Sequence, residues 1–335
     1  MNKIDKITQD IYNNFDKKNI IIATVDEFIR VYPEYAHNYF SPDSVYQKRV
    51  QQVYPDSMPD YTDTCVIYIP ENFVSNQVIL LEDILKSQDT TLFLDKKLII
   101  ISGSQSKVTL NISSYYKQYI YLDYFLDSGA HAIIIDDIGQ HGDVYTRLYV
   151  GNNAHISYYP IIIDSLLLKY VLDIDLYAPG AQADIRGIYA LNNVQNIEII
   201  SRQLHNAPHT QSSLIFKGIL ASQAQLLFKN LIFINNVGSF AQAEQENKTI
   251  MLSEQARSQS IPSMEILTDD VQCRHGTAIG QLDLEQLYYL QSRGLSESDA
   301  RLLIVQAFFS DLQKIIGDNF YINTLNKRID QKIIL

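Results

Sequence analysis

The sequence predicts a mainly β protein that folds as a parallel β-helix, or solenoid, with a short, partly helical N-terminal region and a helical C-terminal region. Three observations favour this fold. Short runs rich in β-branched and aromatic residues fill the middle of the chain, a loose repeat of about 25 residues runs through them, and apolar residues at helical spacing lie towards the two ends. We therefore expect three regions: 1–64, 65–280 and 281–335.

The first region is expected to be small and only partly helical. Ile4, Ile7, Ile11 and Phe15 recur at helical spacing, and "TVDEFIRVYPEYAHNYF" contains a second short helical pattern. Prolines then interrupt the chain up to about residue 64, which favours loops over further regular structure.

The middle region is predicted to consist of stacked coils of short strands. Runs such as "KLIIIS", "AIIIDD" and "SLIFKGIL" are typical of strands, and no convincing long helix separates them, which argues against a doubly wound α/β fold. Gln105, His131, His155 and Gln182 precede β-type runs at intervals of 26, 24 and 27 residues, and Gln223 is a candidate later member. Such a period suits a β-helix, because each coil can bury its apolar face only against its neighbours.

The last region is predicted to hold two helices. "LDLEQLYYLQSRG" forms the first, with Arg293 in its last turn and Gly294 as its stop. Ser296 caps a second helix that runs to about Ile316. Its apolar stripe comprises Ala300, Leu303, Ile304, Ala307, Phe308 and Ile315. These helices are expected to cap the solenoid or to present a surface to partners.

Composition narrows the classes of function. The formal net charge of −11 opposes binding to nucleic acids and to anionic membranes, and no apolar stretch reaches the roughly 18–20 residues that span a bilayer. No signal peptide is evident at the start. Two cysteines, Cys65 and Cys273, are too few for a disulfide framework, so we expect a cytoplasmic protein.

Familiar catalytic motifs are absent from the sequence. There is no phosphate-binding loop and no dinucleotide-binding fingerprint, so we expect no nucleotide to bind this chain. A polysaccharide-active enzyme is an alternative for a β-helix, but Asp136 and Asp137 are adjacent on a strand and point to opposite faces. His205 and His209 are separated by Pro208 and are expected to form a polar corner rather than a metal site.

The stretch "DDVQCRHG" concentrates chemistry at residues 269–276. Cys273 and His275 are two apart, so in an extended segment they project from the same face. A metal site, a nucleophile with its base, and a buried polar corner all remain open on these residues alone. Two ligands do not complete a zinc or iron site, but a partner subunit can supply the others.

Two long motifs resemble the SufB/SufD family of iron–sulfur cluster assembly proteins. Residues 261–309, "IPSMEILTDDVQCRHGTAIGQLDLEQLYYLQSRGLSESDARLLIVQAFF", resemble its C-terminal signature, and residues 205–220, "HNAPHTQSSLIFKGIL", resemble a second one. Within the family, "CRHG" and "YLQSRG" are closer to the SufD branch. The N-terminal region is shorter than usual, and Asn230 stands where the family commonly has a glycine, which we expect in a turn.

The resemblance implies a right-handed parallel β-helix and a scaffold subunit that is not an enzyme. It implies a SufB-like partner, or a second copy of the chain, at the end of the β-helix, and a SufC-like ABC ATPase at the C-terminal helices. A transient iron–sulfur cluster would then involve His275 and Cys273, in a site shared with the partner subunit. The contact with the ATPase is expected at Leu287, Tyr288, Leu290, Arg293, Leu303 and Phe308. A SufB-like scaffold or a homodimer is the alternative.

Overall fold

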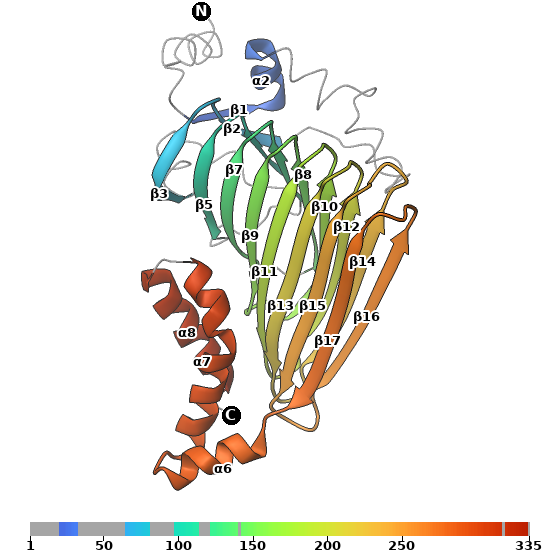
Figure 1. Ribbon diagram of the computed structural model, residues 1–335. Coiled ribbons are helices and arrows are strands. Elements are labelled where there is room, and N and C mark those ends of the chain that lie inside the picture. The colour runs from blue at the N-terminus through green and yellow to red at the C-terminus, as the bar shows by residue number, and fades with distance from the viewer. Residues whose placement is uncertain are drawn as a thin grey trace, which may run out of the picture.

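The fold is a parallel β-solenoid with helices near both ends of the chain, which confirms the predicted class. The structure is a computed structural model that describes residues 20–32, 64–80, 97–113, 121–139, 142–316 and 319–333. The chain alternates between a nine-stranded sheet, here called sheet A, and an eight-stranded sheet, sheet B, so that each coil adds one strand to each (Figure 1).

Neighbouring strands are parallel throughout both sheets, except that β1 is antiparallel to β2. Sheet A contains, in spatial order, β1 (Ile21–Thr24), β2 (Thr64–Ile69), β4 (Lys97–Ser102), β6 (Tyr121–Leu126), β8 (Gly142–Val150), β10 (Leu167–Leu176), β12 (Asn196–His205), β14 (Gln225–Ile234) and β16 (Arg257–Ile266). Sheet B contains β3 (Val74–Leu80), β5 (Lys107–Ser113), β7 (His131–Asp137), β9 (His155–Ile162), β11 (Gln182–Leu191), β13 (Gln211–Leu220), β15 (Gln242–Met251) and β17 (Gln272–Gln281).

The register of sheet B corrects the repeat inferred from the sequence. His131 pairs with His155, and His155 with Gln182, as the repeat predicts, but the partner of His131 in β5 is Lys107. Gln105 lies in the preceding turn with a positive φ of 59°. The later members are Gln211, Gln242 and Gln272. Gln223 was a wrong choice, because it lies in the turn before β14 of sheet A.

The interior between the sheets, here called the lumen, is filled by alternate side chains of every strand. Along β11, for example, Ile185 and Tyr189 are fully buried, whereas Gln182 points outwards. Glycine makes room for aromatic rings: a Cβ on Gly187 would meet the ring of Phe216 at 2.1 Å. The prediction for Asn230 was wrong, because this residue lies in the middle of β14, 5% exposed, and not in a turn.

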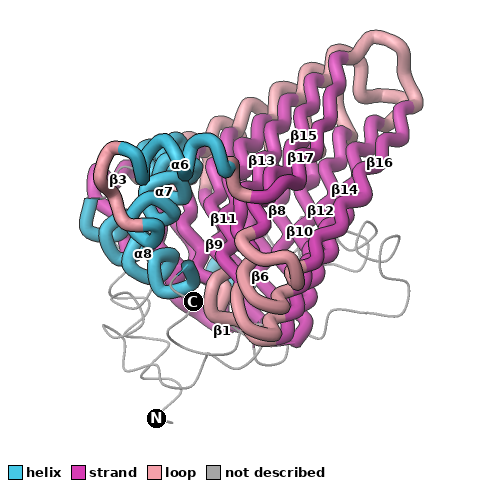
Figure 2. Tube along the Cα trace, turned by 90° about the horizontal axis from the view of Figure 1, so that it is seen from below, coloured by secondary structure: helices cyan, strands magenta, loops and turns pink. Residues whose placement is uncertain are grey.

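Helices cover parts of both outer faces. The short helix α2 (Val25–Val31) packs Phe28 against Tyr68 and Ile99 of sheet A, and it matches the second N-terminal helical pattern. The first predicted helix, at residues 4–15, lies outside the described residues. At the C-terminal end of the chain, α6 (Leu284–Ser292), α7 (Glu297–Ile316) and α8 (Asn319–Ile333) form a C-terminal group, gathered beside the solenoid in Figure 2.

The C-terminal group is fixed to the outer face of sheet B. Apolar residues of α7 and α8 join a buried cluster with Ile161, Ile188 and Ile219. Arg328 of α8 donates hydrogen bonds to Asp137, one of them 3.0 Å long, and to Asp164 at 2.7 Å. Lys217 of β13 bridges to Asp311 of α7 at 2.6 Å. These contacts make the helices part of the solenoid body over several coils.

The structure also corrects the predicted helices. Ser296 does cap α7, since its Oγ accepts from the amide of Asp299 at 3.1 Å, but a third helix, α8, follows. The face of α7 that is fully buried carries Ala300, Val305 and Phe309, whereas Leu303 of the predicted stripe is 46% exposed. None of the helices in the described part of the chain is long and apolar enough to cross a bilayer.

Candidate functional site

No described strand or helix covers the last coil of the solenoid at its far end. Its strands, β16 and β17, are the edge strands of sheets A and B, and together they are called the open end. Side chains that would be buried in any earlier coil are accessible here, and Met264 is 42% and Ile279 36% exposed. The regular edges leave backbone N–H and C=O groups available, which favours pairing with another chain.

Cys273 and His275 lie on the lumen side of β17. Their partners in β15 are Ala243 and Gln245, which are both buried in the lumen, so the parallel register places all four on the same face. His275 is exposed because no coil follows it. Cys273 packs against the small cluster around Ile234 and Ala243. Arg274, between them, points to the outer face and pairs with Glu244 at 2.8 Å.

The environment of Cys273 favours the protonated thiol. Partial burial raises the pKa of Cys273 above its ordinary value, although a hydrogen bond from the backbone of Ala243 opposes this. The thiol is therefore a poor nucleophile in this chain alone, and a metal ion would have to displace its proton. The other cysteine, Cys65, is 2% exposed with its pKa raised to about 12, and it is chemically inert by comparison.

A buried polar group around His205 lies two coils before Cys273, and Ser212 connects it to Cys273 through the register of sheet B. Ser212 pairs with Ala243, which in turn pairs with Cys273. Thr210 donates to the carbonyl of Ala207 at 3.1 Å, so its oxygen accepts from His205 Nδ1 at 2.8 Å. Nε2 then accepts from Ser212 Oγ at 2.8 Å, which fixes a neutral tautomer.

This corner confirms the structural interpretation of His205. The ring is fully buried, and burial lowers its pKa to about 4. His209 does not join it: that residue lies in the turn with a positive φ of 58° and stacks on Phe240, with the ring centroids 5.0 Å apart. The two histidines therefore do not form a common metal site.

The residues present give at most half of a metal site at the open end. Among the described residues, no group of three or more His, Cys, Asp or Glu side chains is placed to hold a metal ion. Cys273 and His275 offer one sulfur and one imidazole from the same face. These donor types suit iron and zinc, but both metals normally need about four ligands. Completion of the site therefore needs ligands from outside the described residues.

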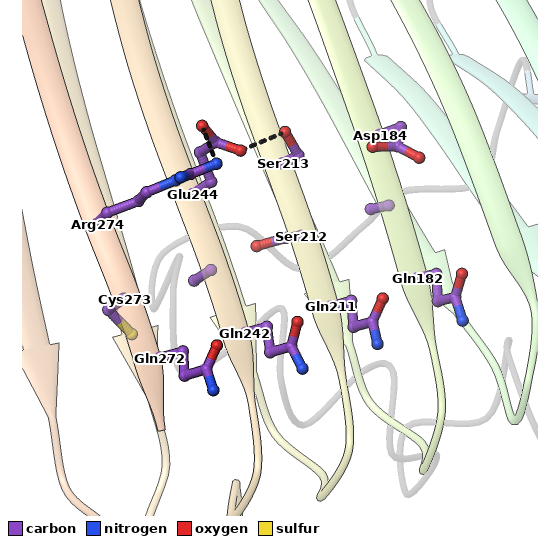
Figure 3. A pocket seen from close by; sticks show the side chains of 12 residues that line it. Gln182, Asp184, Gln211, Ser212, Ser213, Gln242, Glu244, Gln272, Cys273 and Arg274 are labelled. Atoms are coloured by element: carbon purple, nitrogen blue, oxygen red, sulfur yellow. Dashed lines mark hydrogen bonds and ion pairs between the residues drawn. The ribbon is translucent and has the colours of Figure 1, made fainter. Parts of the chain in front are cut away.

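A shallow groove of about 390 Å³ crosses sheet B and reaches the open end (Figure 3). Gln182, Gln211, Gln242 and Gln272 form a row along it, one from each strand. None of its twelve lining residues is aromatic. A catalytic pair of carboxylates would need two free acids facing a substrate.

The acids in and near this groove are already engaged. Glu244 pairs with Arg274, and the His155 ring, 3.0 Å from Asp184, lowers the pKa of that carboxyl. Asp136 is buried in the lumen and accepts from the hydroxyl of Tyr158 at 2.5 Å, whereas Asp137 faces outwards to Arg328. This arrangement gives no support to a polysaccharide-active enzyme.

The residues predicted to contact an ATPase divide into two groups. Leu287 is 3% exposed and packs inside the C-terminal group, with Leu290 and Phe308 partly buried beside the same cluster. Tyr288 and Leu303 are 64% and 46% exposed, and Arg293 is exposed as well. The first three residues therefore support the surface from beneath, and the last three are accessible on it.

Sequence reasoning missed several accessible residues. Tyr289, four positions before Arg293, is 58% exposed, and the guanidinium of Arg293 lies 5.2 Å from its ring centroid. That spacing on a helix is a signal that identifies the pair. Met264 and Ile266 were also missed. The signal there is "MEIL", where the alternation of apolar and polar residues breaks down at the end of β16.

The chain is similar in sequence to known iron–sulfur cluster assembly proteins. Residues 87–308, about two thirds of the chain, match the family model described as "SUF system FeS cluster assembly, SufBD core domain". A SufBD family iron–sulfur cluster assembly protein of Synechocystis is 24% identical over 270 residues, which cover 75% of this chain and 59% of the relative.

Two relatives carry the more specific name, iron–sulfur cluster assembly protein SufD. The Escherichia coli protein is 30% identical over 129 residues, or 38% of this chain and 30% of the relative. The Bacillus subtilis protein is 30% identical over 136 residues, or 41% and 31%. The match thus spans only part of the length of these curated relatives.

Proposed function

The chain belongs to the SufBD family of iron–sulfur cluster assembly proteins, and on this premise we propose that it is a SufD-like, non-catalytic scaffold subunit. In this role it pairs with a SufB-like subunit through the open end and with a SufC-like ATPase through the C-terminal helices. The nascent cluster is cargo of the assembled complex. The observation that carries the proposal is the position of Cys273 and His275 on the uncovered, lumen-side face of the last strand.

The open end has the features of a surface that pairs with another solenoid. β16 and β17 are regular ten-residue strands, and no other described strand pairs with their outer edges. Accessible apolar side chains line the same end, namely Ile261, Met264, Ile266, Leu267 and Ile279. Pairing would continue both sheets and bury these side chains, so hydrogen bonding and apolar burial both favour it.

The C-terminal helices offer a second, separate surface. Leu284, Tyr288, Tyr289 and Leu303 are all more than 45% exposed on α6 and α7. Aromatic side chains and arginine are enriched where proteins bind one another, and Arg293 lies against this group. Because α7 and α8 are fixed to sheet B, a partner bound here would act on the solenoid as one body.

The proposed role in holding a cluster follows from the chemistry of the Cys273 thiol and the His275 imidazole. One thiol and one imidazole can hold part of a cluster, and the partner subunit would provide the other ligands. The raised pKa of the Cys273 thiol keeps this residue protonated in the free chain, so ligation would be coupled to loss of a proton. His275, which is exposed, needs no rearrangement of this chain to reach a ligand.

Co-purification under reducing, oxygen-free conditions tests the proposal. The wild-type chain is expected to retain both a SufB homologue and a SufC homologue. Met264→Lys is expected to lose the SufB homologue and keep the SufC homologue, because a charge would be buried where the two solenoids meet. Tyr288→Asp is expected to do the reverse. Val194→Lys, at a 63% exposed position in a turn, is the matched control.

A chain that binds neither homologue in this experiment would refute the proposal. The alternative, a homodimer, uses the same open end, since a two-fold interface needs only a self-complementary patch. Sedimentation of the isolated chain separates the two: a dimer that Met264→Lys dissociates would favour the homodimer.

A further inference from the structure

The lumen changes its chemistry towards the open end. In β9, β10 and β11 the lumen side chains are mainly Ile, Leu and Tyr. From β12 onwards, uncharged polar side chains replace many of them. These are Ser201, Gln203, Asn230, Gln245, Asn247, Thr249 and Ser258. Apart from His205, which is neutral, no titratable side chain of β12, β14 or β15 is buried there.

Several of these buried groups lack hydrogen-bond partners within the chain. In the described residues, the atoms without one include two amide oxygens, two amide nitrogens and two hydroxyls. They are Gln203 Oε1, Asn230 Oδ1, Gln245 Nε2, Asn247 Nδ2, Ser201 Oγ and Ser258 Oγ. Gln203, Gln245 and Asn247 are at most 1% exposed. Native interiors rarely leave such groups unsatisfied, so donors and acceptors together point to a bound hydrogen-bonding molecule.

Hydrogen bonds and strand register link several of these residues across the lumen. Gln203 Nε2 of sheet A donates to Gln245 Oε1 of sheet B across the lumen, at 3.5 Å. Ser201 and Asn230 are register partners within sheet A. Asn247 Oδ1 accepts from the hydroxyl of Tyr189 at 2.9 Å, which leaves its nitrogen unpaired.

The same region continues to the open end. The register partners of Gln245 and Asn247 in β17 are His275 and Thr277. Across the last coil, Ser260 Oγ lies 3.2 Å from Thr277 Oγ1. The polar groups therefore extend, coil by coil, from Gln203 to the strand that carries the candidate site.

We propose that the lumen of the last coils binds a cluster of ordered water molecules that reaches the lumen side of Cys273 and His275. Water fits because the unpaired atoms are neutral and include both donors and acceptors, whereas an ion would need charged or more numerous ligands. The consequence rests on the proposed function: once a partner covers the open end, this water remains enclosed between the two chains, beside both residues.

A high-resolution crystal structure of the isolated full-length chain tests the water itself. The expected result is ordered water within hydrogen-bond distance of Gln203 Oε1, Gln245 Nε2 and Asn247 Nδ2. A lumen with no ordered water within hydrogen-bond distance of any of these three atoms would overturn the proposal. The measurement needs no partner and no cluster, so its outcome is independent of whether the chain is a SufD-like subunit.

A stability measurement gives a second, independent result. The double variant Gln203→Met, Gln245→Met removes the amide pair with little change in volume. If water satisfies the free ends of both amides, the melting temperature falls, because those hydrogen bonds are lost. If the lumen is dry, the variant removes two buried amides that each have one unsatisfied end, so the melting temperature rises, and a rise or no change would count against the proposal. Gln242→Met, on the exposed side of β15, is the matched control and should leave it unchanged.

Discussion

The ring of Tyr189 occupies the space in which a side chain at position 218 would lie. The two residues are register partners in sheet B, and a Cβ on Gly218 would come within 1.9 Å of the ring. The tyrosine hydroxyl reaches past this glycine to β15, where it meets Thr249 Oγ1 at 2.6 Å and Asn247 Oδ1 at 2.9 Å. Gly218, the glycine of the "KGIL" motif, thus leaves room for Tyr189 of β11 to reach past β13 and bond to β15.

Gly218→Ala is expected to destabilise the chain by about 1–3 kcal/mol, because the added methyl forces the Tyr189 ring away from its partners. Chemical denaturation measures the loss. Gly280→Ala is the control, since a Cβ there meets nothing within 4 Å. If the two variants were equally stable, the close approach at Gly218 would have no energetic consequence.

His205 is expected to make stability depend on pH. Burial lowers its folded pKa to about 4, below the usual value near 6.5, so the unfolded chain binds the extra proton first as pH falls. The contribution is complete above about pH 6.5 and is lost between there and pH 4, for a total of about 3 kcal/mol. Urea titrations of wild type and His205→Gln across this range should show a smaller loss in the variant. His209→Gln, in the exposed turn, should follow the wild type.

Arg328 is expected to hold α8 against sheet B. Arg328→Met leaves Asp137 and Asp164 without their guanidinium partner and should cost about 1–3 kcal/mol. Hydrogen exchange of the α8 amides should accelerate, while exchange in the solenoid core stays slow. Arg301→Met removes only a surface pair with Glu297 and should change little. Equal exchange in both variants would argue that apolar packing alone fixes the helix.

His275→Ala separates a role in assembly from a role in folding. The side chain is exposed, so the melting temperature of the isolated chain should stay within about a degree of the wild type. Iron and sulfide bound by the purified complex after anaerobic reconstitution should fall. Arg274→Ala, on the opposite face of the same strand, should retain both. A drop of several degrees for His275→Ala would instead indicate a structural corner.

The sequence contains enough information to predict the fold class, because the strand-type runs and the repeat can be recognised even where single positions deviate from the pattern. The sequence does not reveal which residues of neighbouring strands pair with one another. The spacing between register partners grows from 24 residues at His131 and His155 to 31 at Gln211 and Gln242, so a search at a constant period loses the later coils. Helix α8 was missed because its buried residues, Leu325, Ile329 and Ile333, are embedded in polar and charged sequence.

The candidate site could be predicted only in part from the sequence. The two-residue spacing of Cys273 and His275 correctly places them on one face, since β17 is a regular strand. That this face belongs to an uncovered coil depends on where the stack of strands ends, which no local pattern reports. The lumen amides were equally hidden, because Gln245 and Asn247 in "QAEQENKT" resemble a solvent-facing segment, although they are among the least exposed residues of β15.

The antiparallel strand β1 bears on how many chains can join. It is the terminal strand of sheet A at that end, and the terminal strand of sheet B, β3, is irregular in its register with β5 between Val74 and Val78. A solenoid with two regular edges would add further copies head to tail and grow into a fibre. Among the described strands, β16 and β17 are the ten-residue parallel strands that end the two sheets, whereas β1 has four residues and β3 seven. Two chains that meet at β16 and β17 would present only these short or irregular strands to a third, so we expect a pair rather than a fibre.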